Sequence, residues 1–411
     1  DGLAALNVAL PIFTVYTTFS VLIGVGAATA IAVCRGEGRR EGENTVFTQA
    51  VLLVAAIGLL ISILGTVFLR QVAYLFGATD RIVEGVVSYL LPINPLAVIF
   101  MLSSAMSIIV RSDGNPRLVM LACTVGNLLN ILLDFVFVMP LGMGLFGAGL
   151  ATIIGPTVTL GILSLHFITR RNGVHFTRHI GSGRLLLRLL QGGVGAGVLE
   201  LSAGFVILFF NIALLRISGE TAVAVFSIIS NIAYVGKGIF NGMAQAAQPI
   251  ISLSYGAGEY GRMRTVNRYA MVTALVFSLA VYVLVLLFPG QLVSLFVSGD
   301  QEVLNLGIPA VRLYFLSFPF TALNTVLMYY FQSSERVLPT FSMALLRGVV
   351  LIYLALQLLP MALGDQRHMA GAGCSGKSGF LHILAGQAHH RQAAAASHRK
   401  ESASVMLLQP A

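Results

Sequence analysis

The sequence predicts an all-α protein that crosses a membrane many times and consists of two pseudo-symmetric helical lobes. Of its 411 residues, 57% are hydrophobic and 10% are charged, whereas a soluble domain carries about 25% charged residues. Ten apolar runs are each long enough for a membrane-spanning helix, which needs about 20 residues. The second half of the chain also repeats features of the first. Together these observations predict a polytopic helical membrane protein.

The ten runs are separated by short links that contain Gly, Pro or charged residues. They cover residues 4–33, 46–69, 82–110, 118–139, 146–168, 190–215, 222–255, 270–288, 304–331 and 337–363. Several runs contain proline, which membrane helices tolerate where neighbouring groups satisfy the freed backbone. These positions are candidate kinks: Pro11, Pro92, Pro95, Pro156, Pro249 and Pro319.

The net charge of +9 indicates a topology rather than a nucleic-acid partner. Arginines gather after the first, third, fifth and seventh runs, and the intervening links are poorer in them. Basic residues that recur on every second loop mark the cytoplasmic side of a membrane protein. The three cysteines have neither metal-ligand spacing nor a disulfide framework.

The internal repeat has an offset of 220 positions. Gly36-Glu37-Gly38 matches Gly256-Ala257-Gly258 (256 minus 36), and Leu75-Phe76 matches Leu295-Phe296 (295 minus 75). An even number of spans separates the copies, so the repeat is parallel, and parallel repeats place a substrate site between the halves. We therefore expect an N-terminal lobe over 1–175, an inter-lobe loop over 176–189, a C-terminal lobe over 190–363, and a polar tail over 364–411.

A polar face interrupts the fourth apolar run. Asn127, Asn130 and Asp134 are spaced by three and four, so they lie on one side of a helix. Thr152 reaches the same level if residues 140–144 form a tight hairpin. A carboxylate at the centre of a membrane helix costs about 2.5–3.5 kcal/mol and by default marks a functional site. The set suits a hard cation such as Na⁺, with Asp134 and Asn130 as metal ligands, or a carboxylate that exchanges a proton; the alternative is a network that only joins two helices.

The second half carries two charges inside apolar runs, Glu200 and Lys237. They form either an ion pair or a site that faces a central cavity, and the cost of isolated charges favours the pair. Seven aromatic residues could line a cavity for flat lipophilic cations, although packing is their usual role: Phe209, Phe210, Phe226, Tyr234, Tyr314, Phe318 and Phe320.

The tail contains a P-loop pattern, with Gly371, Gly376, Lys377 and Ser378 in the phosphate-binding spacing. That motif works between a buried strand and a helix, and no such strand precedes it. We therefore do not expect a working nucleotide site, and an ATP-using enzyme is an alternative that rests on this motif alone. We interpret residues from about Asp365 onward as frame-shifted, because the composition changes there to a polar, Ala- and His-rich one.

With these residues in view, the chain resembles the bacterial branch of the multidrug and toxic compound extrusion (MATE) family from Asp1 to about Leu363. The segments that carry the resemblance are residues 130–137, 142–152, 3–7, 242–251, 255–258 and 330–332. The family has twelve helices in two lobes, and its members export drugs in exchange for Na⁺ or H⁺. The ten runs here match its second to eleventh helices, without the first helix and with an altered twelfth.

By that resemblance, Asp134, Asn130 and Thr152 match the cation-binding residues of the N-terminal lobe. The resemblance implies a cation-coupled antiporter for lipophilic, often cationic compounds, not an enzyme, in the bacterial inner membrane. It implies no cofactor beyond the coupling ion, and we expect a monomer. Two alternatives stay open: a lipid-linked precursor flippase of the same superfamily, which would carry more cationic residues facing the cavity, and a non-functional truncated product.

Overall fold

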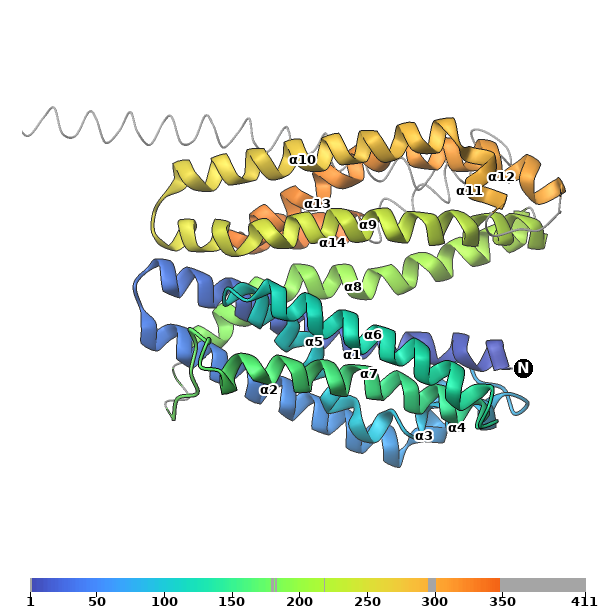
Figure 1. The fold of residues 1–411 in the computed structure, drawn as a ribbon, viewed down its shortest axis with the longest axis horizontal. Helices are drawn as coiled ribbons and strands as arrows, with labels where there is room; N and C mark the ends of the chain where they lie inside the picture. Colours follow the sequence, from blue (N-terminus) through green and yellow to red (C-terminus); the bar gives the residue numbers. More distant parts are fainter. Residues whose placement is uncertain (1, 179–180, 182, 218, 295–300, 348–411) are drawn as a thin grey trace, which may run out of the picture. The chain divides into compact units, whose positions relative to one another are not determined.

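The computed structural model describes residues 2–178, 181, 183–217, 219–294 and 301–347. Fourteen α-helices and one 3-10 turn follow one another along these residues (Figure 1). In order they are α1 (Gly2–Gly36), α2 (Arg40–Val67), α3 (Leu69–Leu75), α4 (Val83–Leu90), η1 (Asn94–Leu96), α5 (Ala97–Ser112), α6 (Pro116–Val138), α7 (Gly144–Ile168), α8 (Gly183–Ile217), α9 (Gly219–Gly256), α10 (Tyr260–Leu287), α11 (Pro289–Ser294), α12 (Gln301–Phe315), α13 (Phe318–Ser333) and α14 (Val337–Leu345). The predicted all-α fold is confirmed.

Within the described residues, seven helices are long and apolar enough to cross a membrane, or eight if the bent pair of α12 and α13 counts as one span. Their surfaces are apolar where a soluble protein would be polar. On α6, Met120 is 68% exposed and Ile131 is 65% exposed, and on α10 Val276 is 59% exposed. Apolar surface of this extent marks contact with lipid or a partner, which agrees with the predicted membrane spans.

The element boundaries repeat at the offset that the sequence predicts. Helix α10 begins 220 positions after α2 (260 minus 40) and ends 220 after it (287 minus 67), and α9 ends 220 after α1 (256 minus 36). Both halves also break a span at the equivalent place. Residues 91–96 separate α4 from α5, and a bend of 42° separates α12 from α13.

The break between α4 and α5 falls at Pro92 and Pro95 and is stabilised by a buried amide. Asn94 is fully buried; its Oδ1 accepts from the Tyr16 hydroxyl (2.7 Å) and its Nδ2 donates to the Gly65 carbonyl (2.8 Å). These bonds tie α1 and α2 to the interruption, so a helix broken by proline keeps its polar groups satisfied.

The chain divides into two compact units. Unit 1 comprises residues 1–208, 242–270 and 327–348, and unit 2 comprises 209–241, 271–326 and 349–411. In unit 1, α5 packs against α1, α2 and α7. Its core includes the fully buried side chains of Ile23, Phe47, Leu90, Met101 and Ile153.

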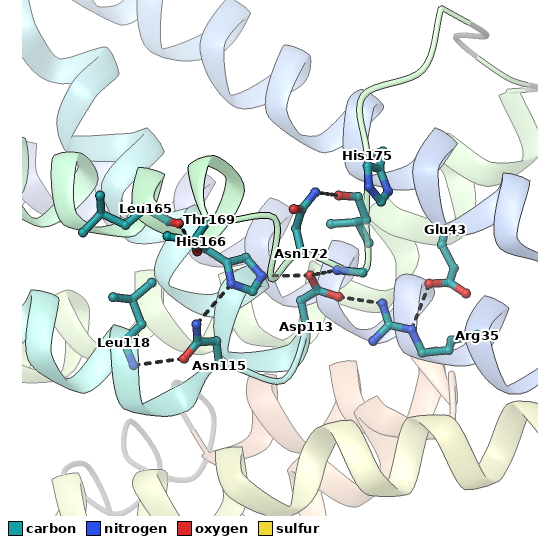
Figure 2. A network of polar contacts seen from close by, with 12 residues as sticks. Arg35, Glu43, Asp113, Asn115, Leu118, Leu165, His166, Thr169, Asn172 and His175 are labelled. Carbon is teal, nitrogen blue, oxygen red and sulfur yellow. Dashed lines mark hydrogen bonds and ion pairs between the residues drawn. The ribbon is translucent and has the colours of Figure 1, made fainter.

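We call the end of unit 1 that carries the loops 36–40, 112–116, 169–178, 256–260 and 333–337 the basic end. A polar network there fixes the link between α7 and α8 (Figure 2). The buried Asp113 carboxylate accepts from Arg35 Nη2 (2.6 Å), His166 Nε2 (3.0 Å) and the Gly173 backbone N–H (2.8 Å). Arg35 Nε also donates to Glu43 (2.9 Å). We call this set the Asp113 network.

The Asp113 network also fixes the tautomer of His166. Asn115 caps α6, because its Oδ1 accepts from the Leu118 backbone N–H (3.3 Å). Its Nδ2 therefore faces His166 Nδ1 at 3.2 Å. Nδ1 accepts that bond, so the ring proton sits on Nε2 and is donated to Asp113.

Candidate functional site

The candidate site lies on the helical hairpin of α6 and α7 in unit 1. The two backbones approach closely, because a Cβ on Gly126 would lie 2.1 Å from Thr159 Oγ1 and one on Gly155 would lie 2.9 Å from the Gly126 carbonyl. Toward the turn, Gly147 packs against Phe137. Asp134 lies in the sequence between the parts of α6 that make these contacts, and its approach to Thr152 across the hairpin stays a prediction.

Asn130 packs against the glycine face of α7 but leaves one polar atom without a partner. Its side chain is half-buried, and its Cβ lies 3.2 Å from the position of a Gly155 Cβ. Its Nδ2 is fully buried and has no hydrogen-bond partner among the described residues. A buried unpaired amide costs about 1–3 kcal/mol, and an amide can turn to present either nitrogen or oxygen. Asn130 therefore has the capacity to bind another polar group.

Asp134 is half-buried on α6. Within the described part of the chain it accepts no hydrogen bond and makes no ion pair. The ionisable group in its electrostatic neighbourhood is the hydroxyl of Tyr89 on α4. No basic residue in the described ranges pairs with this carboxylate, which lies in an apolar helix where a bound proton or cation would compensate its charge.

Thr152 contacts Tyr89, a residue that the sequence reasoning did not select. The two hydroxyls lie 3.2 Å apart, and Thr152 Oγ1 also donates to the Ala148 carbonyl (2.8 Å). Tyr89 on α4 therefore contacts Thr152 on α7 and lies in the electrostatic neighbourhood of Asp134 on α6, one turn after Asn130, and a cation site formed by these residues stays a prediction. Their carboxylate, amide and hydroxyl oxygens are the donors that hard cations prefer.

Asn127 is exposed one turn before Asn130 and has no hydrogen-bond partner within the described residues. Its support of a cation site stays a prediction.

The comparison with known families decides what kind of protein carries this site. The MatE family model matches residues 1–136 and 196–356, well over half of the chain. The chain belongs to the MatE family. It is therefore a multi-pass membrane transporter of the MATE type, and the resemblance seen in the sequence is confirmed.

Two relatives of this MATE transporter carry names that describe multidrug export or resistance. The multidrug export protein MepA of Staphylococcus saprophyticus is 23% identical over 354 residues, which cover 85% of this chain and 77% of MepA. The probable multidrug resistance protein YoeA of Bacillus subtilis is 22% identical over 317 residues, which cover 74% of this chain and 67% of YoeA.

Solved MATE structures share the fold. An outward-facing multidrug resistance MATE transporter of the MOP superfamily matches with a TM-score of 0.87 and 26% identity, and covers 94% of this chain and 87% of its own. A MOP superfamily transporter from Pyrococcus furiosus, described as having a binding pocket of reverse polarity, matches with a TM-score of 0.85 and 26% identity, over 92% of this chain and 86% of its own.

The charged residues predicted for the second half of the MATE chain lie in different compact units, Glu200 in unit 1 and Lys237 in unit 2. The ion pair between them stays a prediction. Lys237 Nζ donates to the Tyr314 hydroxyl (3.1 Å) and lies 5.8 Å from the centroid of that ring. Glu200 is half-buried near the half-buried Tyr329, which accepts from Gln245 Nε2 (3.1 Å).

Two of the aromatic candidates, Tyr314 and Phe318, pack against each other in unit 2 with ring centroids 6.3 Å apart. Phe318 stacks on Phe315 with centroids 4.1 Å apart and meets Phe240 at 5.5 Å, and all three are buried. Tyr234, unlike these buried residues, is 80% exposed. The side chains of Phe209 and Phe210, the P-loop pattern at 371–378 and the change of composition at Asp365 lie outside the described residues.

Proposed function

We propose that this MATE transporter is a cation-coupled antiporter that exports lipophilic, often cationic compounds by alternating access. Asp134 binds the coupling ion, H⁺ or Na⁺, and Asn130 and Thr152 supply neutral ligands. The observation that carries the proposal is the Asp134 carboxylate, which lies in the apolar helix α6 with no hydrogen bond or ion pair from any described residue.

The energetics of that carboxylate explain why it would be coupled to transport. An uncompensated charge at membrane depth costs about 2.5–3.5 kcal/mol, so the site favours a bound proton or metal cation. The unpaired amide of Asn130 and the Tyr89–Thr152 hydroxyls supply further polar groups around it. An ion that binds one conformation more tightly than another shifts the equilibrium between them by its differential affinity.

Exchange follows when the substrate prefers the opposite conformation. Ion entry then drives substrate exit, and the two lobes, over 1–175 and 190–363, are the parts that move. The names of the relatives support the class of substrate, since MepA is a multidrug export protein and YoeA a probable multidrug resistance protein. We place the protein in the bacterial inner membrane.

The test is export of a fluorescent lipophilic cation, ethidium, from drug-sensitive bacteria that produce the chain. Wild type should lower the dye content of the cells, and Asp134→Asn should abolish export at unchanged membrane content. The matched control is Asp80→Asn, which makes the same chemical change in the link after α3 and should export like wild type. Export by Asp134→Asn at the wild-type rate, or no export by wild type, overturns the proposal.

The coupling ion is identified in proteoliposomes loaded with ethidium. An inward pH gradient or an inward Na⁺ gradient is imposed separately on wild type and on Asp134→Asn. The gradient that drives dye release from wild type but not from Asp134→Asn identifies the coupling ion. Dye release that depends on neither gradient contradicts antiport.

A further inference from the structure

Helices α1 and α9 make a reciprocal contact at the basic end of unit 1. A Cβ on Gly36 would lie 2.2 Å from the Leu253 carbonyl oxygen, and a Cβ on Gly256 would lie 2.1 Å from the Val33 carbonyl oxygen. These residues are equivalent in the repeat, because 253 minus 33 and 256 minus 36 both equal 220. Each helix thus presents a glycine to a carbonyl of its repeat partner, and neither position has room for a side chain.

Arg188, near the start of α8, joins the two halves of the repeat beside this contact. Its Nε and Nη2 donate to the two carboxylate oxygens of Glu335 (2.5 and 2.8 Å), and Nη2 also donates to Glu37 (2.7 Å). Glu37 follows α1, and Glu335 lies between α13 and α14. The three side chains are 19–28% exposed. A planar guanidinium suits such a two-sided bridge, which a lysine cannot reproduce.

The backbone at Glu335 supports a specific need for that carboxylate. Glu335 has a φ of +53°, a conformation that is uncommon for residues other than glycine and asparagine. The equivalent turn of the first half puts its positive φ, +97°, on Gly114. A glutamate is therefore retained where a glycine would adopt the turn more easily.

Two buried side-chain amides add bonds between the same helices. Gln248 on α9 donates to Thr29 Oγ1 on α1 (3.2 Å), and Gln332 on α13 donates to the Gly192 carbonyl on α8 (3.2 Å). All of these residues belong to unit 1. Helices from both halves of the repeat are thus packed together at this end.

We propose that Arg188, Glu37 and Glu335 form a clasp that holds the basic end of the transporter closed on the Gly36–Gly256 contact. The inference rests on the proposed function, because alternating access requires this end to open once in each cycle. The clasp sets the share of molecules that are closed here. Weakening it, or placing a side chain at either glycine, favours the open state.

The experiment measures the width of the basic end directly, by electron-spin distance measurements in lipid nanodiscs. Spin labels are attached at Glu41→Cys and Arg264→Cys, two exposed positions on α2 and α10, in a background with the native cysteines replaced by alanine. A second pair, Glu41→Cys with Arg171→Cys, lies within the first half and reports whether that half is folded.

We expect Glu335→Gln, Arg188→Lys, Gly36→Ala and Gly256→Ala each to raise the longer-distance population roughly three- to tenfold. The two glycine variants should act alike because they are equivalent in the repeat. Glu259→Gln, which changes an exposed carboxylate at the same end, and Gly261→Ala, which has open space around it, should match the background.

The clasp is refuted if Glu335→Gln and Gly36→Ala keep the background distances while the first-half pair shows a folded protein. If all four variants keep the background distances and still export ethidium, the clasp is wrong and the proposed function is unaffected. Loss of export in the wild type, with distances that respond to the variants, would instead refute the proposed function and keep the clasp.

Discussion

Two carboxylates on neighbouring helices, Asp113 and Asp134, are treated in opposite ways by the same fold. Asp113 ends α5 and is almost fully buried, and it accepts bonds from Arg35, His166 and the Gly173 N–H. Asp134, four residues before the end of α6, receives neither a hydrogen bond nor an ion pair from the residues that the structure describes. Among these described residues, the charge of Asp113 is compensated and that of Asp134 is not.

The difference separates structural charges from binding charges. A buried ion pair whose partners are all present stabilises one arrangement, and removing one partner is expensive. A carboxylate without a partner in an apolar helix is stabilised by a proton or cation that binds and dissociates. We therefore interpret the Asp113 network as a fixed joint between α5, α7 and the loop that leads to α8, and the Asp134 site as the exchangeable one.

The largest effect should come from Asp113→Ala. It leaves Arg35, the His166 ring and the Gly173 N–H without their shared acceptor, so the free energy of unfolding should fall by about 3 kcal/mol. Thermal unfolding in detergent micelles measures this. Asp134→Asn should melt at or above the wild-type temperature, because it removes an uncompensated charge. If the two variants melt alike, the contrast between the sites is wrong.

His166→Ala should have a smaller effect of the same kind. It removes the Nε2 donor to Asp113 and the Nδ1 acceptor for Asn115, two buried hydrogen bonds, at about 1–2 kcal/mol in the free energy of unfolding. Because Asp113→Ala already breaks the first of these bonds, the double variant should lose less than the sum of the two single variants. Strict additivity in the same melting assay would show that the residues act independently.

The membrane fold could be predicted from the sequence, and Asp134 could be selected as a candidate, but the contact of Thr152 with Tyr89 could not be predicted. The apolar runs and the polar face of α6 are local patterns, and the 220-residue offset is a regular repeat, so each can be recognised from residue spacing alone. Tyr89 was missed because it stands 63 positions from Thr152 in a run where a tyrosine has no distinctive neighbour. Only the packing of α4 on α7 brings them together.

The specific interactions at the basic end could not be predicted from the sequence, for a related reason. Asp113 and Asn115 stand in a Gly- and Pro-containing turn that reads as an ordinary loop. Their partners, Arg35 and His166, are 78 and 51 positions away. Arg188 likewise looks like one member of a basic loop, whereas its two carboxylates lie 151 and 147 positions away. Positive charge at this end signals topology in the sequence, and the structure gives individual arginines specific partners.

Tyr89→Phe should sharpen the description of the exchangeable site with a modest effect. It removes the hydroxyl that contacts Thr152 and faces Asp134 but keeps the ring, which packs 6.2 Å from Phe13. We expect stability to change by less than about 1 kcal/mol and the concentration of coupling ion needed for half-maximal export to rise severalfold. The ion dependence of ethidium export measures this, with Tyr74→Phe, at an exposed tyrosine, as the control. An unchanged ion dependence would exclude Tyr89 from the site.

The smallest effect should be that of mild acid on the clasp. Hydrogen bonds from Arg188, with the nearby charge of Arg39, hold the pKa of the Glu37 carboxyl below its usual range. A carboxylate whose pKa is lowered by its partner contributes its full stabilisation above its ordinary pKa and loses it as the pH falls through the lowered value. Since the ordinary value is about 4.3, the distance between labels at positions 41 and 264 should not change between pH 7.5 and pH 5. Opening should begin only below about pH 4. Opening between pH 7 and pH 5 in wild type, but not in Asp134→Asn, would contradict this expectation. It would show that protonation of Asp134, rather than of Glu37, opens the basic end, so that the two sites are coupled.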